Sequence, residues 1–120
     1  MSDHDSDLVI VETFEDGVVA RFLQDVLLDP IQVEQVGRQL RGALDAADPA
    51  NMVISLESVS QLSSLMLSVL VAMRSEAEAR GGKVALAAIP DRVDYLLKIT
   101  NLTKAFPAFA TTEEALASFA

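Results

Sequence analysis

The chain has 120 residues and a formal net charge of −9, and hydrophobic residues make up 51% of it. This length and apolar content predict one domain with a single hydrophobic core, and they exclude a disordered chain. The acidic balance argues against nucleic acid, which requires a basic surface, and disfavours an anionic membrane surface. It is compatible with a basic protein partner, or simply with a solvated acidic surface.

Residues 1–7 read MSDHDSD and predict a disordered acidic tail, followed by a single domain over residues 8–120. The tail contains no apolar segment of the kind that signal peptides carry. No apolar run is long enough to span a bilayer, and the absence of cysteine excludes disulfides and thiolate metal sites. We therefore expect a cytoplasmic protein without membrane insertion.

The first half of the chain predicts a hairpin and then a helix. Residues 8–14 and 18–23 are apolar and flank a turn that contains glycine, so they are expected to be paired strands. The loop over residues 24–29 carries apolar side chains and is expected to pack. The Asp-Pro pair at residues 29–30 predicts the start of an amphipathic helix that runs to about residue 46.

The second half alternates strands and helices. Residues 52–56 predict a buried strand, and a helix is expected from Leu62 or Ser63 to about Arg80. This alternation predicts an α/β fold with a mixed, mostly parallel sheet of four to five strands and about four helices. The remaining elements are expected to be a strand over residues 83–88, a helix over 92–99, an edge strand over 106–109 and a helix over 114–119.

The sequence offers no catalytic constellation. Its single histidine, His4, lies in the acidic tail, which makes a metal site or a Ser-His-Asp triad improbable. Neither GxGxxG nor GxxxxGK[ST] occurs, so no dinucleotide or P-loop site is indicated. We predict no catalytic residues, no cofactor and no metal, and a protein that is not an enzyme.

Two adjacent serines, Ser63 and Ser64, stand where the predicted strand hands over to the second helix. Backbone N–H groups and the helix dipole converge at a helix N-terminus and favour negative charge there. A phosphoryl group on either serine would sit in a favourable field and would alter the surface around it. We predict phosphorylation at Ser64, with Ser63 as the alternative.

The helix after these serines is apolar on more than one face. With Met66 and Met73 toward the core, a second face is expected to point outward and to bind a partner. The alternative is that the first helix covers this face, or that the helical phase is displaced by one position. The expected partner-binding residues are Glu57, Ser58, Ser63, Ser64, Leu67, Val71 and Arg74.

Several segments, taken in order, resemble the STAS domain of the anti-sigma factor antagonists. Residues 55–59 (SLESV) and 63–67 (SSLML) stand where that family carries D-L-S-G-V and D-S-S-G-L-G. Residues 79–84, 99–106 and 112–116 are similar to its helix stop, its T-G-L…F segment and its closing T-x-E-E-A-L. The resemblance extends over residues 8–119 and implies a STAS-like fold.

The resemblance also implies a function. In this family an anti-sigma factor, which is a serine kinase of the histidine-kinase-like ATPase fold, binds the unphosphorylated domain and releases its sigma factor. Phosphorylation of the serine that maps onto Ser64 blocks the binding, and a serine phosphatase restores it. The motif differs here, because Ser63 replaces Asp, Leu65 replaces Ser and Met66 replaces Gly.

These differences keep two other functions open. One is a non-phosphorylated STAS interaction module, such as a soluble subunit of a membrane transporter. The other is a small-molecule or nucleotide binder without turnover, supported only by the strand-to-helix N-terminus. Exposed leucine and valine side chains would also permit a weak homodimer.

Overall fold

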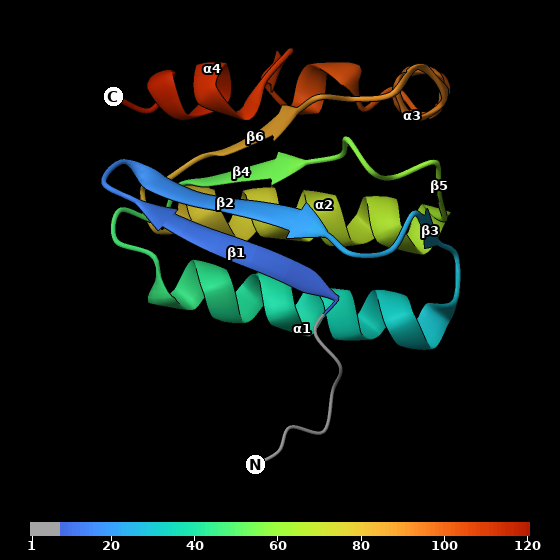
Figure 1. The fold of residues 1–120 in the computed structure, drawn as a ribbon, viewed down its shortest axis with the longest axis horizontal. Coiled ribbons are helices and arrows are strands. Elements are labelled where there is room, and N and C mark those ends of the chain that lie inside the picture. The colour runs from blue at the N-terminus through green and yellow to red at the C-terminus, as the bar shows by residue number, and fades with distance from the viewer. Residues whose placement is uncertain (1–7) are drawn as a thin grey trace.

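The computed structural model describes residues 8–120, so the predicted tail and its His4 lie outside the described part. A central sheet has helices on both of its faces (Figure 1). The elements are β1 (Val9–Phe14), β2 (Gly17–Phe22), β3 (Val26–Leu27), α1 (Pro30–Ala46), β4 (Met52–Ser55), β5 (Gln61–Leu62), α2 (Ser64–Ala79), β6 (Val84–Ala87), α3 (Asp91–Ile99), a 3₁₀ turn (Thr103–Ala105), β7 (Ala108–Phe109) and α4 (Thr112–Ala117).

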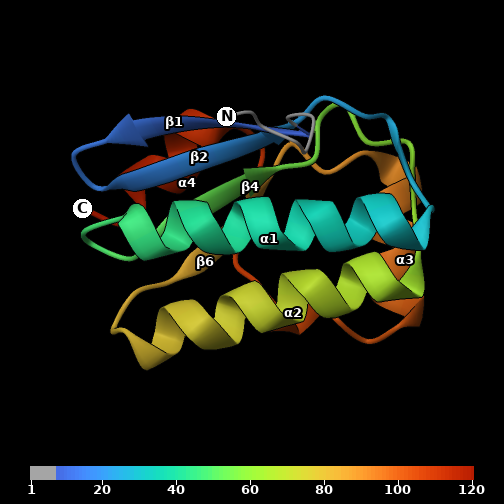
Figure 2. The same cartoon turned by 90° about the horizontal axis from the view of Figure 1, so that it is seen from below.

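The main sheet has five strands in the order β1-β2-β4-β6-β7. The β1–β2 hairpin is antiparallel, and every other neighbouring pair is parallel. Helices α1 and α2 lie side by side on one face, and α4 lies on the other (Figures 1 and 2). This arrangement confirms the predicted α/β fold with its opening hairpin and its mixed, mostly parallel sheet.

A second, smaller sheet was not predicted. Strands β3 and β5 form a parallel ladder of two residues each, in which Val26 pairs with Gln61 and Leu27 pairs with Leu62. The first segment was expected to be a loop, and the second helix was expected to begin at Leu62 or Ser63, because two residues are too few to show a strand period. The ladder joins the segment before α1 to the segment before α2, and so it fixes the N-terminal ends of both helices.

The helix starts follow from local capping. Asp29 accepts a hydrogen bond through Oδ1 from the N–H of Ile31 at 2.9 Å, which caps α1 as predicted. Thr111 accepts from the N–H of Glu114 at 3.1 Å, and α4 therefore begins at Thr112, two residues before the predicted start.

The two faces of the sheet are packed differently. Leucine, methionine, valine and isoleucine side chains fill the layer under α1 and α2. The layer under α4 is made of smaller side chains, which lets this short helix lie close to the sheet. The buried residues of that thinner layer are Val19, Val53, Ala85, Ala87 and Ala115. Among residues 8–120, no helix combines the length and the hydropathy that crossing a bilayer requires.

At the end of the sheet where β2, β4 and β6 begin, one asparagine joins three segments. The carbonyl of Asn51 accepts from the N–H of Val18 at 2.9 Å, and its side-chain amide donates to the carbonyl of Asp16 at 3.0 Å. Its Oδ1 accepts from the N–H of Lys83 at 3.0 Å. Asn51 thereby ties the hairpin turn and the turn before β6 to the start of β4.

Backbone segments meet closely at the same place. A Cβ atom added to Gly82 would lie 1.8 Å from the carbonyl oxygen of Ala50, so only glycine fits there. We call this region the closed end, and it consists of Asp16, Gly17, Ala50, Asn51 and Gly82.

Candidate protein-docking site

Ser63 stands between β5 and α2 and is held by its neighbours. Its N–H donates to the carbonyl of Leu27 at 3.0 Å, which continues the β3–β5 ladder. Its Oγ accepts from the N–H of Met66 at 3.2 Å and caps the helix. The hydroxyl of Ser63 is therefore used by the fold, and the side chain is half-buried.

Ser64 is the first residue of α2, and it is exposed. The first bond of the helical ladder runs from the N–H of Leu67 to the carbonyl of Ser63, at 3.1 Å. The N–H groups of Ser64 and Leu65 precede that ladder and lie at the positive end of the helix dipole. A phosphoryl group on Ser64 would therefore lie beside backbone donors.

The expected outward face of α2 is wrong at Leu67. This side chain is 5% exposed and belongs to the core, together with Met66 and Leu70. The reason is that α2 packs against both α1 and β6, so its buried arc is wider than that of a helix with one neighbour. Val71 is half-buried against the same core, and Arg74 is half-buried with its Nε 3.2 Å from Oε2 of Glu78.

Glu57 and Ser58 are exposed in the turn after β4. Ser58 donates through its hydroxyl to the carbonyl of Phe22 at 3.0 Å. Both residues border a hollow that is also lined by Arg21 and Ser55. That hollow differs from the two that contain the sequence neighbours of Ser64, so the structure divides the predicted partner-binding residues between different places.

The first hollow beside Ser64 is a groove of about 360 Å³ between α1 and α2. Gly37 of α1 faces Val69 of α2 closely, because a Cβ on the glycine would lie 3.6 Å from the valine methyl group. Arg41 borders the groove, and its Nη2 lies 2.9 Å from Oε2 of Glu76, which raises the pKa of Arg41. We call it the α1–α2 groove, and its apolar lining is Pro30, Val33, Gly37, Leu65, Val69, Ala72 and Met73.

The second hollow, of about 250 Å³, lies between β5 and α3. Tyr95 and Ile99 of α3 border it and are 66% and 60% exposed, while Val93 and Leu97 hold the helix to the core. Arg92 contributes a positive charge at the border. We call it the β5–α3 groove, and its lining includes Leu28, Gln61, Leu62, Val93, Tyr95, Leu96 and Ile99.

Exposed large apolar side chains gather at this end of the molecule. They follow β2 and β3, lie in the first turn of α1 or α2, or lie on the solvent side of α3. These parts of the elements lie around the β3–β5 ladder (Figure 1). Such a concentration of exposed apolar side chains is typical of an interaction surface. We call this region the open end, and its exposed apolar residues are Leu23, Leu28, Ile31, Leu65, Tyr95 and Ile99.

The open end was not predicted from the sequence, although the sequence contains one signal for it. Tyr95 and Ile99 are spaced by four residues and fall outside the core phase of Val93 and Leu97. Two large apolar side chains on the solvent side of a short helix indicate a surface that a partner covers. Within residues 8–120, no group of three or more histidine or acidic residues could hold a metal ion.

Several solved structures of other proteins have the same fold as this chain. An anti-sigma factor antagonist from Mycobacterium paratuberculosis is 23% identical, with a TM-score of 0.80 over 99% of this chain and 98% of that one. The anti-sigma factor antagonist SpoIIAA in its unphosphorylated form is 22% identical, with a TM-score of 0.76 over 92% and 94%. A sulfate transporter family protein from Wolinella succinogenes is 18% identical, with a TM-score of 0.66 over 83% and 81%.

With these TM-scores and identities of 18–23%, the similarities establish that the fold is shared and do not identify a binding partner. The family assignment has independent support, because the family model of the STAS domain matches residues 16–115. That match includes the segment that carries Ser63 and Ser64 and extends into α4. The chain belongs to the STAS domain family, a family of non-catalytic interaction modules.

Proposed function

We propose that this chain is an anti-sigma factor antagonist, a cytoplasmic switch that acts by binding and carries out no catalysis of its own. Its partner is an anti-sigma factor that is also a serine kinase of the histidine-kinase-like ATPase fold. One observation carries the proposal: Ser64, with its hydroxyl group, is exposed at the start of α2, next in sequence to Leu65 of the α1–α2 groove and two residues after Leu62 of the β5–α3 groove. A partner that covers the open end would reach this hydroxyl.

Phosphorylation of Ser64 is the proposed control. It adds a charge of about −1.5 to −2 at pH 7. The helix N-terminus tolerates that charge in the free protein. An apolar partner surface that docks here would remove water from the phosphoryl group, and the cost of this desolvation weakens the complex. Removal of the group by a serine phosphatase would restore binding.

The altered motif residues are compatible with this control. Met66, which replaces a family glycine, is fully buried, so its side chain stays out of the way of an approaching kinase. Leu65, which replaces a family serine, is 46% exposed and adds apolar area at the border of the α1–α2 groove. Ser63 is the weaker acceptor, because its hydroxyl already caps the helix.

The test is a phosphorylation assay with the kinase that co-purifies with this chain from its native host. Incubation with ATP should add the mass of one phosphoryl group, and Ser64→Ala should abolish the gain. Ser75→Ala is the matched control, because Ser75 is an exposed serine on the same helix and lines neither groove. No gain, or a gain mapped to another residue, contradicts the assignment of Ser64.

A second candidate function is a non-phosphorylated interaction module of a membrane transporter. The similarity to the sulfate transporter family protein favours it, as does the apolar Leu65 at a polar motif position. Co-purification separates the two, because a transporter subunit in the complex supports the second function and an ATPase of the histidine-kinase-like fold supports the first. In the second case Ser64→Asp should leave partner binding unchanged.

A further inference from the structure

The two edges of the main sheet are protected to different degrees. The β7 edge is two residues long and follows Pro107, so it offers little for another strand to bind. The β1 edge is six residues long, contains no proline or lysine, and exposes Ile10, Val11 and Phe14. No strand within residues 8–120 pairs with its outer side. An open edge of this kind is a template for pairing with another chain.

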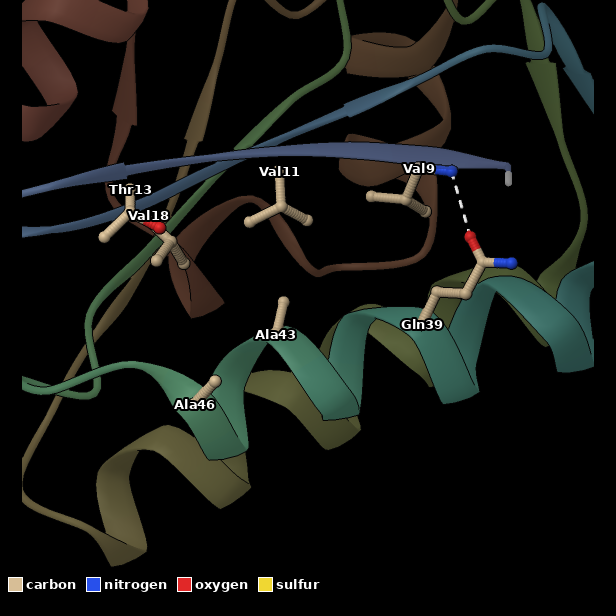
Figure 3. A pocket seen from close by; sticks show the side chains of 7 residues that line it. All are labelled: Val9, Val11, Thr13, Val18, Gln39, Ala43 and Ala46. Atoms are coloured by element: carbon tan, nitrogen blue, oxygen red, sulfur yellow. Dashed lines mark hydrogen bonds between the residues drawn. The ribbon is translucent and has the colours of Figure 1, made fainter. Parts of the chain in front are cut away.

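The hydrogen bonds identify which backbone groups of β1 face outward. The N–H of Leu23 donates to the carbonyl of Leu8 at 3.0 Å, and in an antiparallel ladder alternate residues bond to the same neighbour. Val9, Val11 and Thr13 therefore direct their N–H and C=O groups away from β2. The N–H of Val9 is already used, because it donates to Oε1 of Gln39 at 3.0 Å (Figure 3).

We propose that β1 pairs with β1 of a second copy of this chain, antiparallel about a two-fold axis at Glu12. In this register Val11 of each copy lies opposite Thr13 of the other, and their outward groups form the shared ladder without displacing Gln39. Ile10 lies opposite Phe14 of the second copy, which pairs exposed apolar side chains across the axis. The register is self-complementary, as a closed dimer requires.

A hollow beside this edge leaves room for the second copy. It has a volume of about 300 Å³ and lies between β1 and α1 (Figure 3). Its helical wall is formed by Gln39, Ala43 and Ala46, and the two alanines are small enough to leave space under the edge. Val11 and Thr13 point toward this wall in Figure 3, so the same residues of the second copy would point to the same side of the extended sheet.

The pairing has one unfavourable contact, which makes it testable. Glu12 of one copy lies opposite Glu12 of the other, and like charges at opposed positions destabilise a sheet. Arg21 compensates in part, because its Nε lies 3.4 Å from Oε1 of Glu12 in the same chain. A six-residue edge buries less than the roughly 1,200 Å² of a standard interface. The dimer is therefore weak and depends on concentration.

Sedimentation velocity of the full chain, across micromolar to millimolar concentrations, tests the proposal. The wild-type chain should show a reversible monomer–dimer equilibrium. Val11→Pro removes a donor that points away from β2, and it should weaken the dimer by about tenfold or more. Phe14→Glu should do the same through the side chain, and it keeps the test open if the proline variant does not fold.

Glu12→Gln should instead tighten the dimer, by about threefold, because it removes the like-charge contact. Glu78→Gln is the matched control, because Glu78 is also paired with an arginine, Arg74, and the variant makes the same charge change on α2, away from β1. A chain that stays monomeric throughout, or a dimer that these β1 variants leave unchanged, overturns the proposal. So does a dimer that Tyr95→Ala disrupts, because that result places the contact at the open end. The phosphorylation of Ser64 is tested by a separate assay, and the result of that assay does not depend on whether the dimer forms.

Discussion

The closed end and the open end of this sheet are built in opposite ways. At the closed end, backbone groups meet one another directly through Asn51 and Gly82, and apolar side chains play little part. At the open end, short ladders and caps hold the backbone, and large apolar side chains face solvent. The difference teaches that backbone contacts hold this fold together at one end, while exposed apolar side chains gather at the other, the end at which α/β sheets commonly bind ligands.

The variant with the largest expected effect is Gly82→Ala, which tests the close backbone contact at the closed end. Because the new Cβ would lie 1.8 Å from a backbone oxygen, the start of β6 must move away from the start of β4. We expect a loss of about 3 kcal/mol or more in the free energy of unfolding, measured by urea denaturation. Gly81→Ala is the control, because Gly81 has open space around it and a φ of 79°, and it should lose only about 1 kcal/mol. Equal losses would contradict the close contact.

A second variant tests the asparagine. Asn51→Ala removes the side-chain bonds to the carbonyl of Asp16 and the N–H of Lys83, and it should lower the free energy of unfolding by about 2 kcal/mol. Asn51→Asp keeps the acceptor for Lys83 but loses the donor, so its loss should be intermediate. Thermal unfolding of the three proteins gives the order. If the aspartate variant is as stable as the wild type, the bond to Asp16 contributes nothing.

At the open end, the cap of α2 should have a smaller effect. Ser63→Ala removes the acceptor for the N–H of Met66 and should cost about 1 kcal/mol in unfolding free energy. Ser63→Asp supplies another acceptor and a charge that suits the helix N-terminus, so it should be nearly neutral. Ser64→Ala is the matched control and should change the stability by less than about 0.5 kcal/mol. Equal losses in both alanine variants would contradict the division of roles between the two serines.

The variants with the smallest expected change in stability test most directly whether the open end binds a partner. Tyr95→Ala and Ile99→Ala remove exposed side chains, so the free energy of unfolding should stay within about 0.5 kcal/mol of wild type. Binding to the co-purified partner, measured by calorimetry, should weaken by about tenfold if these side chains anchor the complex. Unchanged affinity in both variants would remove the β5–α3 groove from the proposed docking surface.

The sequence predicted best what depends on local chemistry. Asp29, Ser63 and Thr111 cap the helices because a short polar side chain bonds to N–H groups two or three residues away, and that pattern is visible in the chain. The edge strand expected over residues 106–109 is present as β7, and Pro107 just before it cannot donate to a ladder.

The failures of prediction concern contacts between distant segments. Leu67 was expected to point outward, and it is buried because α2 meets two neighbours that helical periodicity does not reveal. The pairing of Val26 with Gln61 joins segments that are separated in the chain by α1 and β4, so neither short strand was recognisable by itself. The position of the two grooves also depends on how α1, α2 and α3 are placed, and no single segment of sequence carries that information.

Two serine hydroxyls of the loop after β4 donate hydrogen bonds to the end of β2 and to the segment that follows it. Ser58 donates to the carbonyl of Phe22 at 3.0 Å, and Ser60 donates to the carbonyl of Asp25 at 3.1 Å. These two hydrogen bonds hold the loop in place in the free protein. A partner would therefore meet a surface already in its final shape, and association should be fast, with little rearrangement of this chain.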